Sequence, residues 1–218
     1  MATGYKKART KPRPEPEPFE AEPTWEIARL FPPQGMWSEE EFFALPNNHR
    51  IEFSNGRLEF LPTPTIYHQL ILQFLYEELK AFVKARKLGI VVLTGYKVRV
   101  QRRMYREPDI LFISAKHMSG IGKQYCKKAD LVIEIVSEEN RPHDITKKRG
   151  EYERGGIPEC WIVDPEKETI TVLVLKPRKK TYAEHGVFAK GDRATSKLLP
   201  GFSVDVTTAV TQKPELPE

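Results

Sequence analysis

Two acidic residues stand beside or within strongly apolar segments, where a carboxylate is least expected. Asp109 follows a proline and opens the apolar segment 110–113, and Glu134 lies inside the apolar segment 131–136. An ionised carboxylate buried without a partner is costly, so Glu134 needs a cation, a metal ion or a proton. Either it binds a metal, or it lies where a strand leaves the core and meets an Arg or Lys.

Two carboxylates on adjacent strands could hold one hard cation. Mg²⁺ prefers oxygen ligands and commonly takes one or two carboxylates together with waters and substrate phosphate. Such a metal lowers the pKa of a bound water and offsets charge on phosphate oxygens. Asp109 and Glu134 are therefore candidate ligands for Mg²⁺ or Mn²⁺ in a site for phosphodiester hydrolysis.

Six short motifs, taken together in order and spacing, resemble the Uma-two family of restriction-endonuclease-like proteins. They extend over roughly residues 37–175 and comprise NHRIEFSNGRLE at 48–59, PTIYH at 64–68, EPDI at 107–110, DLVIEIVS at 130–137, DxxxKxxxY at 144–152 and GIPECWIVD at 156–164. Each motif alone is a weak signal. The set is specific, and it is similar to the PD-(D/E)XK nuclease superfamily.

This resemblance implies an α/β (α+β) fold with a mixed central sheet flanked by helices and an N-terminal β-hairpin. It also implies a Mg²⁺-dependent nuclease that acts on DNA and often forms a homodimer. Within the motifs, Asp109 corresponds to the Asp of the Pro-Asp element and Glu134 to the second acidic residue, both as metal ligands.

The chain departs from the superfamily pattern at the lysine expected two residues after Glu134, where it has Val136. Lys148, four residues after Asp144 on the following predicted helix, could supply the missing cation and stabilise phosphate charge. We favour Lys148 over Lys147. The same spacing also suits an ordinary salt bridge between residues four apart on a helix.

Two further residues match family positions that resemble additional site residues. Glu52 lies between two apolar residues of the predicted hairpin, which would direct its side chain inward. His68, at the start of a predicted long helix, could bind metal, position water or transfer a proton. For His68, the alternatives are a helix cap or plain surface exposure.

Positive charge favours a polyanionic partner. The 35 Lys and Arg against 30 Asp and Glu give a net charge of +5. Much of the excess lies in residues 5–13, which could attract nucleic acid nonspecifically or simply be solvated. Four arginines precede the Pro-Asp element and would either contact a phosphate backbone or solvate a turn; they are Arg99, Arg102, Arg103 and Arg106.

Regular spacing of apolar residues, capping residues and turn residues predicts the elements that position these groups. The order is a short helix after Ser38 ending at Pro46, a hairpin at 50–61 with an Asn55-Gly56 turn, a helix at 65–87, strands at 90–100, 109–113 and 131–136, a helix at 144–154, and strands at 159–163 and 169–175. Tyr152 and Trp161 are expected in the core.

Composition limits the domain organisation and the setting. We expect a basic, proline-rich disordered tail at 1–35, one restriction-endonuclease-like domain at 36–206 and a flexible tail at 207–218. No apolar run is long enough for a membrane span and the N-terminus has no signal-peptide pattern, which favours the cytoplasm. Cys126 and Cys160 are too few for a disulfide scaffold or a zinc site, so both are ordinary thiols.

The leading hypothesis is a cytoplasmic, Mg²⁺-dependent endonuclease of DNA. In it Asp109 and Glu134 hold the metal, Lys148 stabilises charge, and Glu52 or His68 supports the metal or the water. Val136 supports an alternative, a catalytically weak or inactive nucleic-acid-binding or scaffold protein on the same fold. The same residues would also serve hydrolysis of RNA or of a smaller phosphodiester.

Overall fold

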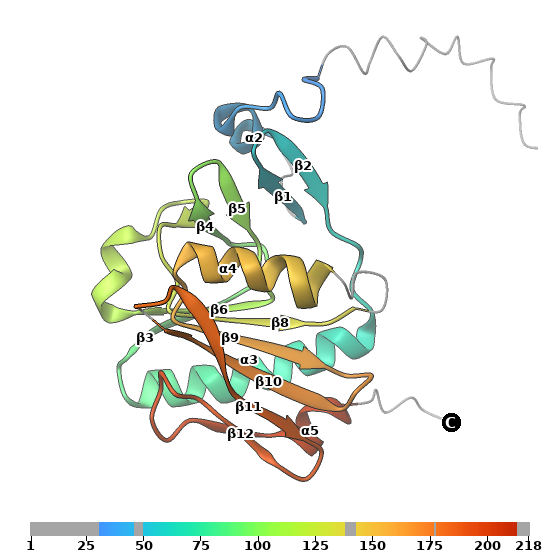
Figure 1. Ribbon diagram of the computed structural model, residues 1–218, viewed down its shortest axis with the longest axis vertical. Coiled ribbons are helices and arrows are strands. Elements are labelled where there is room, and N and C mark those ends of the chain that lie inside the picture. The colour runs from blue at the N-terminus through green and yellow to red at the C-terminus, as the bar shows by residue number, and fades with distance from the viewer. Residues whose placement is uncertain (1–30, 46–49, 138–142, 177, 213–218) are drawn as a thin grey trace, which may run out of the picture. The chain divides into compact units, whose positions relative to one another are not determined.

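A six-stranded sheet with helices on both faces carries the apolar segments that contain the candidate carboxylates (Figure 1). The computed structural model describes residues 31–45, 50–137, 143–176 and 178–212, without the side chains of 143–145. The sheet order is β11-β10-β9-β8-β6-β3, formed by β3 (Gly89–Leu93), β6 (Ile110–Ser114), β8 (Leu131–Ile135), β9 (Glu159–Asp164), β10 (Thr169–Lys176) and β11 (Thr181–Ala189). Only the β8–β9 pair in it is parallel, among the described strands.

A second sheet of five strands contains the predicted hairpin. Its order is β2-β1-β5-β4-β7, formed by β1 (Ile51–Ser54), β2 (Arg57–Phe60), β4 (Lys97–Gln101), β5 (Met104–Arg106) and β7 (Tyr125–Cys126). Asn55 and Gly56 both have positive φ, as the two-residue turn requires. A Cβ on Gly56 would lie 2.3 Å from the Gly35 carbonyl oxygen, so this position also needs glycine for lack of space.

The free edge of β2 is covered by the segment that precedes the first helix. The Gln34 side-chain amide accepts from the Leu58 N–H at 2.8 Å and donates to the Leu58 carbonyl at 3.4 Å. The backbone N–H groups of Gly35 and Trp37 both donate to the Gly56 carbonyl, at 2.7 and 3.2 Å. This segment thus supplies hydrogen bonds that a neighbouring strand would otherwise make.

Helices cover the sheets, and three of the helical regions were predicted, those after Ser38, at 65–87 and at 144–154. They are α2 (Glu39–Ala44), α3 (Ile66–Ala85), the 3₁₀ helix η1 (Ala115–Gly120), the π-helix η2 (His143–Lys148), α4 (Arg149–Gly155) and α5 (Val206–Val210). The capping box of Ser38 with Glu41 is present at α2. Gly156 ends α4 in the left-handed conformation, φ 74°.

The side chains of β8 alternate between two apolar clusters. Ile133 and its odd-numbered neighbours pack with α3, whereas Val132 packs with Tyr152 of α4, and Figure 1 shows α3 and α4 on opposite sides of β8. Because side chains alternate along a strand, Glu134 points to the α4 side. Tyr152 and Trp161 are both fully buried, which confirms their predicted place in the core.

The structure corrects several predicted boundaries. The strand predicted at 90–100 is two strands, because the chain turns at Gly95 with φ 95° and passes from one sheet to the other. Strands β5, β11, β12 (Arg193–Thr195) and β13 (Ser203–Asp205) were not predicted. Strand β5 is too short to show an alternation of apolar and polar residues.

The prediction of a flexible tail at 207–218 was wrong for the first residues of that range. Residues 207–210 belong to α5, whose first turn is capped by the Asp205 carboxylate accepting from the Thr208 N–H at 2.8 Å. Ala209 and Val210 are buried in the cluster that covers α3. A five-residue helix shows too little of a period to be recognised from the sequence, and it is ordered by packing. Of the predicted disordered tail at 1–35, residues 1–30 lie outside the described residues, whereas Gln34 and Gly35 are held by their hydrogen bonds to Leu58 and Gly56.

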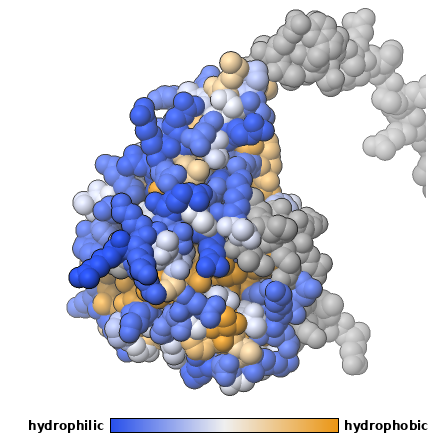
Figure 2. All heavy atoms as spheres, viewed as in Figure 1, coloured by the Kyte–Doolittle hydropathy of each residue, from blue (hydrophilic) through white to orange (hydrophobic). Residues whose placement is uncertain are grey.

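No helix in the described part of the chain is long and apolar enough to cross a membrane. The face drawn in Figure 2 is mostly hydrophilic, with separate small apolar patches.

Burial makes both cysteines poor nucleophiles. Desolvation raises the pKa of the Cys126 thiol to about 12 and raises that of Cys160 further above its usual range. The thiolate is the reactive form, so we expect almost no labelling by an aromatic disulfide reagent at pH 8 in the native protein. In guanidinium chloride both thiols should react. Rapid labelling of the native protein would contradict this burial.

Candidate active site

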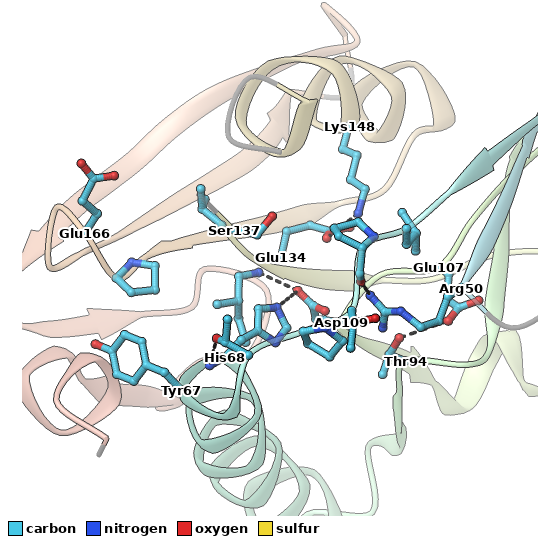
Figure 3. Close-up of a pocket in the computed structure, with 18 residues that line it drawn as sticks. Arg50, Tyr67, His68, Thr94, Glu107, Asp109, Glu134, Ser137, Lys148 and Glu166 are labelled. Carbon is cyan, nitrogen blue, oxygen red and sulfur yellow. Dashed lines mark hydrogen bonds and ion pairs between the residues drawn. The ribbon is translucent and has the colours of Figure 1, made fainter. Parts of the chain in front are cut away.

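A pocket of about 430 Å³ opens where β6 begins and β8 ends. Its wall is formed by Arg50, residues 61–65, Tyr67 and His68 of α3, Thr94, Glu107, Asp109, residues 134–137, Lys148, Pro165 and Glu166. Four of the five predicted site residues line it, namely His68, Asp109, Glu134 and Lys148. Figure 3 shows these four at the centre, with Arg50 and Glu107 on one side and Tyr67 and Glu166 on the other.

Asp109 lies across the sheet from Glu134. In the antiparallel β6–β8 pair Ile110 is opposite Ile133, so continuing the register by one residue brings the two carboxylates to neighbouring positions. The Asp109 Oδ2 accepts from the Ile135 N–H at 2.8 Å, which fixes the carboxylate at the mouth of the pocket. The sequence prediction that these two residues meet is consistent with this placement.

His68 contacts Asp109 from the first turn of α3. Its Nε2 lies 3.3 Å from the Asp109 Oδ2. Thr65, not His68, caps the helix, since the Thr65 hydroxyl accepts from the His68 N–H at 3.2 Å. The alternative of a capping histidine is therefore wrong, and the imidazole belongs to the pocket.

Glu134 is buried between two donors on the helix opposite. Lys148 Nζ donates to Oε2 at 2.9 Å and the Tyr152 hydroxyl donates to Oε1. Burial, followed by the nearby Glu134 charge, raises the pKa of Tyr152 well above its ordinary value, so the phenol keeps its proton and remains a donor. Lys148 and Tyr152 are four residues apart and thus lie on one helical face.

Lys147 is directed elsewhere, because its Nζ pairs with Glu59 of β2 at 2.8 Å. The preference for Lys148 over Lys147 is consistent with this arrangement. The side chain of Asp144, which completes the predicted helical face, lies outside the described residues.

Glu52 lies beside the site without lining the pocket. Its carboxylate accepts from the Glu107 N–H at 2.9 Å and from Arg106 Nη1 at 3.0 Å, and it lies 3.7 Å from Lys148 Nζ. Glu52 is fully buried. Its contacts suit the positioning of Lys148 better than contact with a substrate.

Arg106 connects the hairpin to the helix that carries Lys148. It is fully buried and forms ion pairs with Glu52 of β1 at 3.0 Å, Glu59 of β2 at 3.1 Å and Glu151 of α4 at 2.5 Å. Burial by itself lowers the pKa of the guanidinium, but Glu151 and the other carboxylates more than reverse this, so Arg106 stays charged.

The predicted arginine cluster is therefore divided. Arg106 is enclosed in ion pairs, whereas Arg103, in the turn between β4 and β5, donates to the Trp37 carbonyl at 3.0 Å. Charge spacing in the sequence could not distinguish the buried Arg106 from Arg99, Arg102 and Arg103, which are exposed.

Two charged residues of the pocket, Glu107 and Arg50, are among those to which the sequence assigned no role. Glu107 is buried; one oxygen accepts from the Gly95 N–H at 2.9 Å and the Thr94 hydroxyl at 3.2 Å, and the other from Lys97 Nζ at 3.0 Å. In the sequence, the position of Glu107 directly before Pro108 and Asp109 could have indicated that it lies at the site. Arg50 is the second such residue; it stands at the start of the hairpin motif.

The donor set suits a metal ion shared with a substrate. Among the described residues no three His, Cys, Asp or Glu side chains are arranged to enclose a metal. Asp109 and Glu134 nevertheless face one pocket, and Mg²⁺ typically takes only one or two carboxylates, the remaining ligands being water and substrate phosphate. The two carboxylates therefore fit Mg²⁺ in an open site.

A mixed sheet with two carboxylates at one pocket, and a lysine that reaches the same pocket from a covering helix, define a nuclease-like α+β protein. The chain belongs to the Uma2 (Uma-two) family, described as "Putative restriction endonuclease", whose profile matches residues 39–207. A crystal structure described as "a putative nuclease belonging to DUF820 from Anabaena variabilis ATCC 29413" is similar over 79% of this chain and 96% of that chain, with 18% identity and a TM-score of 0.65. That likeness confirms the fold. The chain matches no curated protein.

Arg106→Met should destabilise the fold, because it leaves the carboxylates of Glu52 and Glu151 buried without their cation. We expect the free energy of unfolding in urea to fall by about 3–5 kcal/mol. Arg102→Met, at an exposed arginine of the turn that precedes β5, should change this free energy little. Equal unfolding midpoints for the two variants would show that the buried ion pairs contribute nothing net.

Proposed function

We propose that this protein is a Mg²⁺- or Mn²⁺-dependent endonuclease that hydrolyses phosphodiester bonds in DNA. The observation that carries the proposal is that Asp109, Glu134 and Lys148 line one pocket. They come from the start of β6, from β8 and from η2, which are separate in the sequence. Membership of the family supports a nuclease function.

Asp109 and Glu134 would hold the metal ion. When bound, such an ion lowers the pKa of a water and offsets charge on the phosphate. The Ile135 N–H donates to Asp109 Oδ2 and keeps the carboxylate oriented, and His68 Nε2 lies 3.3 Å from the same oxygen. These contacts preorganise the carboxylate before substrate arrives.

Lys148 would provide the cation that the superfamily places two residues after the second acidic residue. In this chain that position is Val136, whose side chain is buried in the apolar cluster of Tyr152. Lys148 Nζ reaches Glu134 from the opposite helix and borders the pocket. A fixed positive charge there would stabilise charge that develops on the phosphate during attack.

The proposal predicts metal-dependent cleavage of supercoiled and linear DNA that is lost with a chelator. Asp109→Asn and Glu134→Gln should abolish it, because each removes a charged ligand. Lys148→Met should reduce it by about 10²–10³-fold, the range for loss of one charge-stabilising group. Lys147→Met, one residue away and partly exposed, is the matched control and should cleave like the unaltered protein.

Cleavage that survives the chelator or Asp109→Asn would contradict the proposed site. DNA binding without cleavage under every metal condition would favour a binding or scaffold protein on this fold. A panel of duplex DNA, single-stranded DNA, RNA and bis(p-nitrophenyl) phosphate separates the DNA enzyme from hydrolases of RNA or small phosphodiesters.

A further inference from the structure

Arg50 lines the active-site pocket and its guanidinium is incompletely bonded. Its Nη2 donates to the Pro62 carbonyl. Its Nε is buried and has no hydrogen-bond partner in the described part of the chain. A buried donor left unsatisfied costs about 1–3 kcal/mol. Such a group on a pocket wall indicates a ligand atom that completes it.

The backbone of Arg50 is also unusual. Its φ is 59°, in the left-handed region that a long side chain rarely adopts. The Arg50 carbonyl accepts from the Leu61 N–H at 2.8 Å, so backbone and side chain are both bonded to the segment 61–62 that forms the pocket wall. Strain of this kind persists where the surroundings fix a residue, and it gathers at ligand sites.

Neighbouring carboxylates do not account for the Arg50 charge. Glu107 lies beside it on the same side of the pocket in Figure 3, but its carboxylate is paired with Lys97 at 3.0 Å. Among the described residues no carboxylate forms an ion pair with Arg50 within 4.0 Å, whereas Arg106 has three. The half-buried guanidinium of Arg50, on the wall of the pocket, therefore has no anionic partner within the described part of the chain.

Phosphate is the anion whose charge and oxygen acceptors match the guanidinium of Arg50. The guanidinium is planar and always charged, and it binds phosphate oxygens through N–H groups in fixed directions. A substrate phosphate must approach Asp109 and Glu134, two groups of its own charge sign, so a cation that lines the same pocket would favour its entry.

We propose that Arg50 is the phosphate-binding residue of this pocket and that its Nε–H donates to a nonbridging oxygen of the DNA phosphate held against Asp109. This inference rests on the proposed nuclease function and adds to it the residue that holds the substrate. The segment 61–62 aligns the guanidinium through its bonds to the Arg50 carbonyl and Nη2.

The test measures DNA binding separately from cleavage. Fluorescence anisotropy of a labelled duplex with Ca²⁺ in place of Mg²⁺, over a range of salt, gives the dissociation constant and its salt dependence. Arg50→Gln should weaken binding tenfold or more and reduce the slope of log K against log salt by about 0.9, the value of one phosphate contact on duplex DNA. Arg50→Lys should keep the slope and still bind more weakly, because it lacks the Nε–H.

Two further variants separate this effect from misfolding and from general charge loss. Arg50→Gly accepts the left-handed φ and should unfold at no lower temperature while binding as weakly as Arg50→Gln. Arg86→Gln, at the exposed C-cap of α3 and thus at the other end of that helix from His68, removes one charge and should leave affinity and slope unchanged.

The outcomes for this inference and for the nuclease differ. If the unaltered protein cleaves DNA and neither Arg50→Gln nor Arg50→Gly changes the affinity for DNA or the salt slope, the role of Arg50 is overturned and the nuclease function is not. Binding that depends on Arg50 without any cleavage would support the phosphate site and overturn the nuclease. Protein that neither binds nor cleaves DNA would overturn both.

Discussion

The carboxylate of Glu134 on the covered face of β8 is the constraint on which much of the structure depends. An ionised group at that depth requires cations and donors directly against it. The helix that follows supplies both, with Lys148 on one oxygen and Tyr152 on the other. The sheet is therefore covered on this side by a helix whose register is set by a charge as well as by apolar packing.

That requirement extends outward from the site. Lys148 is close to Glu52, Glu52 is bound to Arg106, and Arg106 is bound to Glu151 on the same helix as Tyr152. The hairpin, β5 and α4 are thus joined by alternating charges, in addition to the apolar cluster that contains Met104 of β5 and Tyr152 of α4. Apolar side chains of similar volume would make such a junction at least as stable, so its value lies in fixing where the lysine stands.

The sequence predicted the main elements where a local rule was strong. The Asn55-Gly56 turn, the capping box at Ser38, the long period of α3 and the buried strands around Asp109 and Glu134 are all present. Short strands such as β5 and the helix α5 escaped prediction because long-range pairing and burial order them, and three to five residues show no clear period.

For the candidate site, the positions of residues within the motifs predicted more than their charge or residue type did. The motifs indicated His68, Asp109, Glu134 and Lys148, which all line the pocket. They could not show that Glu52 lies behind the pocket wall, or that Arg106 is a structural residue while Arg50 faces the pocket. Those distinctions depend on which way a side chain points and what it meets, which the order of charges along a chain does not encode.

The amide of Gln34 has a consequence for how the protein meets other chains. An open strand edge carries a row of unused N–H and C=O groups, which invites another β-strand to join and so begins aggregation. In this chain the Leu58 N–H and C=O are hydrogen-bonded to the side chain of Gln34. The Gly56 carbonyl in the neighbouring turn accepts from the N–H groups of Gly35 and Trp37. The hairpin beside Lys148 is thereby capped by its own chain at Leu58 and Gly56, which hinders the addition of another strand at this edge.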